Sequence, residues 1–100
     1  MLLALNYLHG QNIMHRDLKP ANVLCVRTKD FRLETRLTDF GFATYFDPEV
    51  PQSHPVGTAK YMAPELCKGS PYDCKVDVWA LGILAYYMLT ASVPFIGREE

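Results

Sequence analysis

The sequence predicts a mainly α fold with a small β-hairpin, and three features of the chain support that prediction. Leucines recur at near-helical spacing over residues 2–8, and a second, long apolar helix is predicted from Asp73 to about Thr90. Between these helices lie two short β-prone segments, residues 22–26 and 36–38, which are separated by the charged turn TKDFRLE. With 49% hydrophobic and 12% aromatic residues, 100 residues suffice for the core of one small domain.

Glycine and proline set the expected boundaries of these elements. Gly10 is the expected C-cap of the first helix, and Pro64 and Gly69 are expected to open and close a short helix over residues 65–68. Between the hairpin and this helix, residues 39–64 have no sustained period and contain several glycines and prolines. We therefore expect a long loop there, and long loops inside compact domains are usually functional or disordered.

Composition argues against several classes of partner. Ten basic and eleven acidic residues give a net charge of −1 without a long like-charge block, so nothing favours binding to nucleic acid or to an anionic membrane surface. Cys25, Cys67 and Cys74 lie far apart without CxxC pairs, so we expect ordinary buried or half-buried thiols. Because no signal peptide is recognised either, the expected setting is intracellular and cytoplasmic.

One uncharged stretch raises the question of a membrane. Val78–Gly97 is twenty residues long, which permits a span. Gly82, Thr90, Ser92 and Pro94 all fall within it and argue against a span. A helix that is apolar all round is otherwise buried in a large core. We favour burial in a larger parent fold, with Pro94 ending the helix, and a membrane-anchored fragment is the alternative.

Charged residues are crowded between apolar flanks in MHRDLKPANVL, which occupies residues 14–24. Charges beside apolar sequence must be paired or solvated, because burying them unpaired costs stability. Arg16, Asp17 and Lys19 therefore mark a candidate site.

Four motifs follow one another along the chain: HRDLKPAN at residues 15–22, DFG at 39–41, GTAKYMAPE at 57–65 and DVWALG at 77–82. Together they resemble the C-terminal lobe of a eukaryotic protein kinase. The resemblance covers residues 1–100 and implies a partial kinase domain with the end of helix E, the catalytic loop, DFG, the activation segment, APE and helix F. The implied fold is a protein-kinase-like C-terminal lobe that is incomplete and lacks the N-lobe.

The resemblance implies catalytic roles for Asp17 and Lys19 and metal-binding roles for Asn22 and Asp39. A carboxylate can orient a substrate hydroxyl and accept its proton, and a lysine supplies a mobile positive charge for the phosphoryl group. Carboxylate and amide oxygens suit Mg²⁺, with ATP phosphates completing the coordination. The expected cofactors are ATP and Mg²⁺, and the expected partner is a protein substrate with a serine or threonine acceptor. The lysine of DLKPAN and the threonine at position 58 resemble the residues that serine/threonine kinases have at these positions. In those kinases the threonine hydroxyl bonds the catalytic aspartate and lysine.

Other motif residues have structural roles in the family. The resemblance implies that His15 packs against Phe40, next to Gly41 in DFG. It also implies that Asp77 bonds the backbone of the HRD loop. Glu65 pairs in the family with an arginine that these 100 residues do not include, so we expect it to lack that partner here.

Arg16, Ser53 and Thr58 are expected to belong to the activation segment and substrate pocket. Arg16 is either a solvated surface charge or the residue that receives an activation-loop phosphate, as in kinases controlled by that phosphate. We favour the second interpretation, because a guanidinium beside a catalytic aspartate needs a partner when it is buried.

The activation segment departs from the family at one position. In many phosphate-activated kinases a threonine stands where this chain has His54, and the nearest hydroxyl is Ser53. Three alternatives stay open: Ser53 is the phosphosite, Asp47 and Glu49 supply a standing negative charge, or no phosphate is used. Further candidate phosphosites are Thr44 and Tyr45.

Two family features that hold ATP do not occur in the sequence, a GxGxxG loop and a VAIK-like strand. We therefore expect a segment of a serine/threonine kinase that transfers the γ-phosphate of ATP, inactive as a free chain. The alternative is a truncated, non-catalytic fragment that acts as a binding or regulatory module. DFGFAT and YDCKVDVWALGILAYYML are most similar to calcium/calmodulin-dependent or autophagy-initiating kinases.

Overall fold

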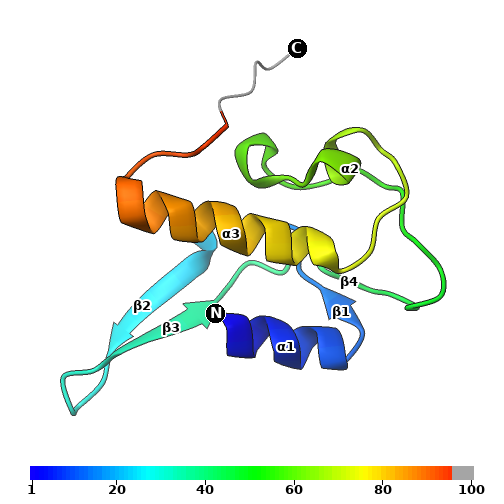
Figure 1. Ribbon diagram of the computed structural model, residues 1–100. Coiled ribbons are helices and arrows are strands. Elements are labelled where there is room, and N and C mark those ends of the chain that lie inside the picture. Colours follow the sequence, from blue (N-terminus) through cyan, green and yellow to red (C-terminus); the bar gives the residue numbers. More distant parts are fainter. Residues whose placement is uncertain (96–100) are drawn as a thin grey trace.

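The computed structural model of the protein describes residues 1–95, and these form helices and two small antiparallel sheets (Figure 1). The helices are α1 (Leu2–Gly10), α2 (Pro64–Cys67) and α3 (Lys75–Thr90). One sheet pairs β1 (Ile13–Met14) with β4 (Thr44–Tyr45), and the other is the hairpin of β2 (Val23–Arg27) and β3 (Leu33–Leu37). Helix α3 crosses the middle of the view, with α2 on one side and α1 and the sheets on the other (Figure 1).

Helix α1 ends differently from the prediction. Gly10 is the last helical residue and not the C-cap, which is Gln11. The reversal in direction comes at Asn12, whose φ of 59° lies in the left-handed region that asparagine tolerates. This turn leads the chain from α1 into β1, and from there into residues 15–22.

The predicted hairpin is present, but its second strand is longer than predicted. That strand begins at Leu33, whereas the sequence pattern placed it at residues 36–38. The turn is closed tightly, because the Thr28 amide donates to the Arg32 carbonyl over 2.8 Å, and the strands can therefore pair immediately beyond it. Asn22, predicted to begin the first strand, lies instead at the end of a 3₁₀ turn.

The predicted long loop over residues 39–64 contains short ordered elements. Strand β4 pairs with β1, Gln52 exchanges two backbone hydrogen bonds of 2.9 and 2.8 Å with Tyr72, and a 3₁₀ turn forms at Ala59–Tyr61. Such two-residue pairings have no periodicity that a sequence pattern could detect. Pro64 then opens α2, as predicted.

Helix α3 begins and ends close to the predicted positions, but for other reasons. It starts at Lys75, whose amide donates to the Asp73 carboxylate over 2.9 Å, so Asp73 precedes the helix. It ends because Ala91 adopts a left-handed φ of 57°, and Pro94, predicted to end it, lies three residues further on.

Among residues 1–95, no helix combines the length and the hydropathy needed to cross a membrane. The alternative of a span over Val78–Gly97 includes residues 96 and 97, which lie outside the described residues.

The expectation for the cysteines is wrong at two positions. Cys25 and Cys67 are exposed, and Cys74 is half-buried. Cys25 belongs to β2, where three of the five strand residues are exposed.

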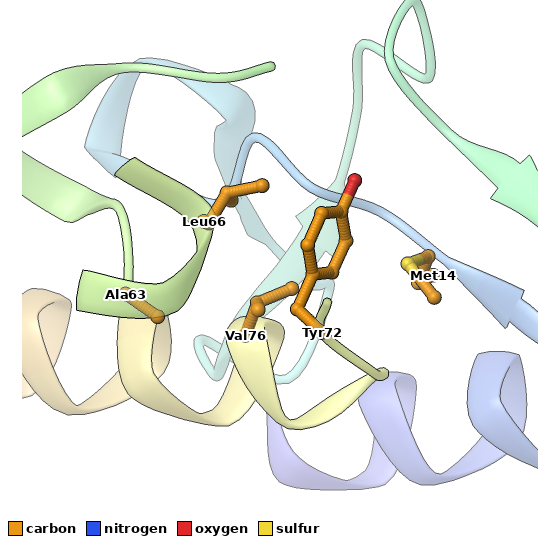
Figure 2. Packing of buried hydrophobic residues seen from close by; sticks show 5 residues of the cluster. All are labelled: Met14, Ala63, Leu66, Tyr72 and Val76. Carbon is orange, nitrogen blue, oxygen red and sulfur yellow. The ribbon is translucent and has the colours of Figure 1, made fainter. Parts of the chain in front are cut away.

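Two clusters of buried side chains hold residues 14–18 against α3. One cluster contains Met14, Ala63, Leu66, Tyr72 and Val76 (Figure 2). The other contains Leu5, Leu18 and Ala80. Each cluster takes one residue from the 14–18 segment and one from α3, and full burial of a leucine-sized side chain stabilises by about 1.5–3 kcal/mol. The charged residues between Met14 and Leu18 are therefore anchored at both ends.

Candidate active site

Asp77 fixes the backbone at the start of the candidate site. Its carboxylate is 1% exposed and accepts hydrogen bonds from the backbone amides of His15 and Arg16, each of 2.8 Å. The His9 Nε2 atom lies 2.9 Å from the same carboxylate. Because a carboxylate can only accept, His9 donates there. A buried charge with three donors is well satisfied, so helices α1 and α3 and residues 15–16 are tied together at this point.

The His15 side chain is fully buried in a directed network. Its Nδ1 atom accepts from the Asp17 amide over 3.1 Å, so the proton of the neutral ring is on Nε2, which donates to the Thr38 carbonyl over 2.9 Å. The ring also contacts Phe40 edge-to-face, with ring centroids 5.0 Å apart. His15 thus links residues 15–17 to the segment that follows β3.

Asp17, Thr58 and Lys19 form a hydrogen-bonded chain across segments that are far apart in sequence. The Thr58 hydroxyl donates to Asp17 Oδ1 over 2.9 Å and accepts from Lys19 Nζ over 2.9 Å. One hydroxyl thereby sets the positions of both charged side chains. Asp17 is 8% exposed, so the residue is mostly shielded from water.

Asn22 holds the other oxygen of Asp17. Its Nδ2 atom donates to the Asp17 carbonyl over 2.7 Å and to Asp17 Oδ2 over 3.2 Å. Among residues 1–95, no buried side-chain nitrogen or oxygen lacks a hydrogen-bond partner, and no partner is present for Asn22 Oδ1. That oxygen is therefore solvent-accessible and can accept a further ligand.

Asp39 lies at the start of the DFG motif with its side chain exposed. Its φ of 58° is left-handed, and its Oδ1 atom accepts from the Gly41 amide over 3.2 Å. No hydrogen bond joins it to Asn22 in the described part of the chain. Within residues 1–95, no three His, Cys, Asp or Glu side chains gather as a metal site. One carboxylate and one amide oxygen nevertheless suit the chemistry of Mg²⁺, which takes most of its remaining ligands from water and phosphate.

Arg16 connects residues 15–22 to two other segments. Its Nε atom donates to the Phe42 carbonyl over 2.7 Å, and Nη1 donates to the Tyr72 hydroxyl over 3.1 Å. Its φ of 69° is left-handed, a strained conformation for arginine. The hydrogen bonds that its own amide and the His15 amide donate to Asp77 help to hold that conformation. Gly57 packs directly against Arg16, since a Cβ built on Gly57 would lie 2.6 Å from the Arg16 carbonyl oxygen.

Two of the expected site residues stay apart from this arrangement. Ser53 is exposed, and its side chain makes no hydrogen bond within residues 1–95. Glu65 is half-buried in the first turn of α2 and makes no ion pair in the same part of the chain.

Sequence reasoning missed two contributors, His9 and Tyr72. His9 stands six residues before His15, at the end of α1, and no local pattern marks its contact with α3. The Tyr72 hydroxyl bonds both Arg16 and the His54 carbonyl. The contacts of His9 and of Tyr72 each join residues more than fifteen positions apart in the sequence, so only the folded structure shows them.

Comparisons with known proteins point to one family. The family model described as "Protein kinase domain" matches residues 1–100. The chain is 45% identical over 96 residues to the serine/threonine-protein kinase AtPK2/AtPK19 of Arabidopsis thaliana, covering 96% of this chain and 20% of that protein. It is 40% identical over 94 residues to myosin light chain kinase A of Dictyostelium discoideum, covering 94% and 32%. It is 42% identical over 92 residues to the Aurora kinase of Saccharomyces cerevisiae, covering 92% and 24%.

The chain thus spans between a fifth and a third of the length of these relatives. Kinases with quite different names match it at similar identity, so the similarity does not select the calcium/calmodulin-dependent or the autophagy-initiating subgroup. The family match and the relatives show that this chain belongs to the protein kinase family, as a segment of a eukaryotic serine/threonine kinase catalytic domain.

Proposed function

We propose that the chain is part of the C-terminal lobe of a serine/threonine kinase that transfers the γ-phosphate of ATP to serine or threonine hydroxyls of a protein substrate. The observation that carries the proposal is the hydrogen-bonded chain from Lys19 through Thr58 to Asp17. The family assignment supports kinase chemistry in general, and this geometry supports specific roles for these three residues.

Asp17 is the proposed base. Its Oδ1 and Oδ2 atoms are each held by a donor, Thr58 and Asn22, so the carboxylate cannot rotate freely. A held carboxylate orients a substrate hydroxyl toward the phosphate and receives its proton as the new P–O bond forms. Partial burial strengthens the hydrogen bond to the incoming hydroxyl, because the local dielectric is lower than that of water.

Lys19 is proposed to stabilise the transferring phosphoryl group. Its ammonium donates to Thr58, a neutral hydroxyl, and two further N–H donors remain for phosphate oxygens. Thr58 is the positioning residue that keeps Lys19 and Asp17 at a fixed separation. Removal of its hydroxyl would free both side chains at once.

Asn22 and Asp39 are proposed to hold Mg²⁺ through Asn22 Oδ1 and the Asp39 carboxylate. Bound Mg²⁺ would neutralise charge on the ATP phosphates. The backbone of Asp39 is left-handed, and the hydrogen bond that its Oδ1 atom accepts from the Gly41 amide limits rotation of the side chain. His15 and Phe40 in turn position the DFG segment through their ring contact.

The boundaries are also part of the proposal: the end of helix E at α1, the catalytic loop at residues 15–22, the activation segment from DFG to APE, and helix F at α3. The remaining contacts to ATP would come from the rest of a longer parent protein, since the relatives are three to five times longer. The isolated 100-residue chain is then expected to be inactive. We place the parent in the cytoplasm.

Phosphotransfer tests the proposal directly. Radiolabelled γ-phosphate transfer to a generic serine/threonine substrate would be measured for the parent protein, its Asp17→Asn variant and its Asp30→Asn variant. Asp30 lies exposed in the hairpin turn, so the same substitution there is a matched control. Activity in the parent and in Asp30→Asn, lost by about 10²-fold or more in Asp17→Asn, supports the base. No transfer by the parent would refute the proposal and favour a binding role.

A further inference from the structure

The contacts of Tyr72 connect the proposed activation segment to Arg16 through a single hydroxyl. Arg16 Nη1 donates to the Tyr72 hydroxyl over 3.1 Å, and that hydroxyl donates to the His54 carbonyl. Tyr72 is only 3% exposed, so neither bond has water as a ready substitute. The guanidinium and the backbone next to Ser53 are thus joined by a continuous relay of donors and acceptors.

The hydroxyl is held in place by the rest of the Tyr72 residue. Figure 2 shows its ring standing between Leu66 and Met14, with the oxygen at the end remote from Val76. The Tyr72 backbone exchanges two hydrogen bonds with Gln52, of 2.9 and 2.8 Å. Ring packing and backbone pairing both fix the hydroxyl relative to residues 52–54.

Arg16 is fixed as firmly on its own side. Its Nε atom donates to the Phe42 carbonyl, and its backbone amide donates to Asp77. Through Arg16 and Tyr72, hydrogen bonds therefore join Phe42, which follows the DFG motif, to residues 52–54. Two residues after this segment the chain reaches Gly57 and Thr58, and the Thr58 hydroxyl bonds Asp17.

Within residues 1–95, no hydrogen bond or ion pair joins the acidic residues of the same loop to Arg16. Asp47 Oδ1 accepts from the Glu49 amide over 2.9 Å, so this carboxylate closes its own turn. Neither residue belongs to an ion pair within residues 1–95. The contacts of Asp47 and Glu49 therefore do not support the alternative that they supply a standing negative charge to Arg16.

We propose that Tyr72 is a positioning residue that links Arg16 to residues 52–54 in place of an activation-loop phosphate, so that the segment leading to Thr58 is ordered without phosphorylation of Ser53. The inference rests on the proposed function, because Arg16 and Thr58 act through the adjacent Asp17. In other kinases a phosphate bridges an arginine to the activation segment. Here the neutral hydroxyl of the tyrosine connects the arginine to that segment.

Kinetics of the parent protein test the proposal. Tyr72→Phe removes only the hydroxyl, and Tyr86→Phe makes the same change at a tyrosine of α3 whose hydroxyl makes no hydrogen bond within residues 1–95. A hydrogen bond to a charged group corresponds to an effect of about tenfold or more. We therefore expect Tyr72→Phe to lower kcat by about tenfold or more, with little change in the KM for ATP. Tyr86→Phe is expected to match the wild type, and phosphatase-treated wild type is expected to keep its kcat. Equal kcat for the two variants, or loss of activity on phosphatase treatment, would overturn the proposal.

Hydrogen exchange of the same proteins separates failure of this inference from failure of the proposed function. Amides of residues 47–58 are expected to exchange faster in Tyr72→Phe than in Tyr86→Phe, whether or not the protein transfers phosphate. Unchanged exchange would contradict the relay. An inactive wild type with faster exchange in Tyr72→Phe would retain the relay while refuting the kinase proposal itself.

Discussion

Replacement of Gly57 by alanine tests how closely the 57–65 segment must approach the HRD segment. A Cβ at this position would lie 2.6 Å from the Arg16 carbonyl oxygen, closer than the 3.0 Å that real Cβ atoms essentially always exceed. The opposing atom is backbone and cannot rotate away, and Gly57 has a φ of +116°, which side chains rarely adopt. Backbone strain costs about 1–3 kcal/mol and overpacking about 1–3 more, so we expect a loss of about 2–6 kcal/mol.

Unfolding in urea, followed for the parent protein and its variants, measures that loss. Gly82→Ala is the matched control, because a Cβ there meets no atom of residues 1–95 within 4 Å. Alanine in a helix interior is favoured over glycine by about 0.5–1 kcal/mol. Gly57→Ala should also lower kcat at temperatures where the variant is folded, since the steric clash involves the Arg16 carbonyl and lies next to Thr58. Equal stability and activity of the two variants would refute the close approach.

Two further predictions concern buried groups near the start of α3. Asp77→Ala leaves two backbone amides and a histidine without their acceptor, so it should lower the free energy of unfolding of the parent by about 2–5 kcal/mol. Urea unfolding measures this loss, and a loss no greater than that of Asp30→Ala would contradict the role of Asp77. Burial raises the pKa of the Cys74 thiol, and the carboxylates of Asp73 and Asp77 raise it further. Less thiolate is then present at a given pH, so near about pH 8 iodoacetamide should modify Cys74 more slowly than exposed Cys67; equal rates in the folded protein would contradict the shift.

The main elements could be predicted because their signals are local. Leucine spacing predicted helix α1, two β-prone runs around a charged turn predicted the hairpin, and Pro64 predicted the start of α2. The position at which α3 ends was predicted, but its cause was not, since the left-handed residue is Ala91, whose side chain gives no sign of that conformation. The β1–β4 pair was missed because two-residue strands carry no pattern.

The candidate site divides in the same way. The motifs point to Asp17, Lys19 and Thr58, and the structure brings these three side chains into contact. Their chemical roles are proposals that kinetics must test. The contacts of His9 and Tyr72 could not be read from the sequence, because each depends on which distant segment the fold places beside it.

A double-mutant cycle on Lys19 and Thr58 tests the central claim, that the Thr58 hydroxyl makes Lys19 and Asp17 act as one unit. The parent protein, Lys19→Met, Thr58→Val and the double variant would be compared by kcat/KM in phosphotransfer. If the hydroxyl positions Lys19, the second substitution removes little that the first has not already removed, so the combined loss should be at least about fivefold smaller than the product of the single losses. Losses that multiply within error would contradict the claim, because they would show that the two side chains contribute independently.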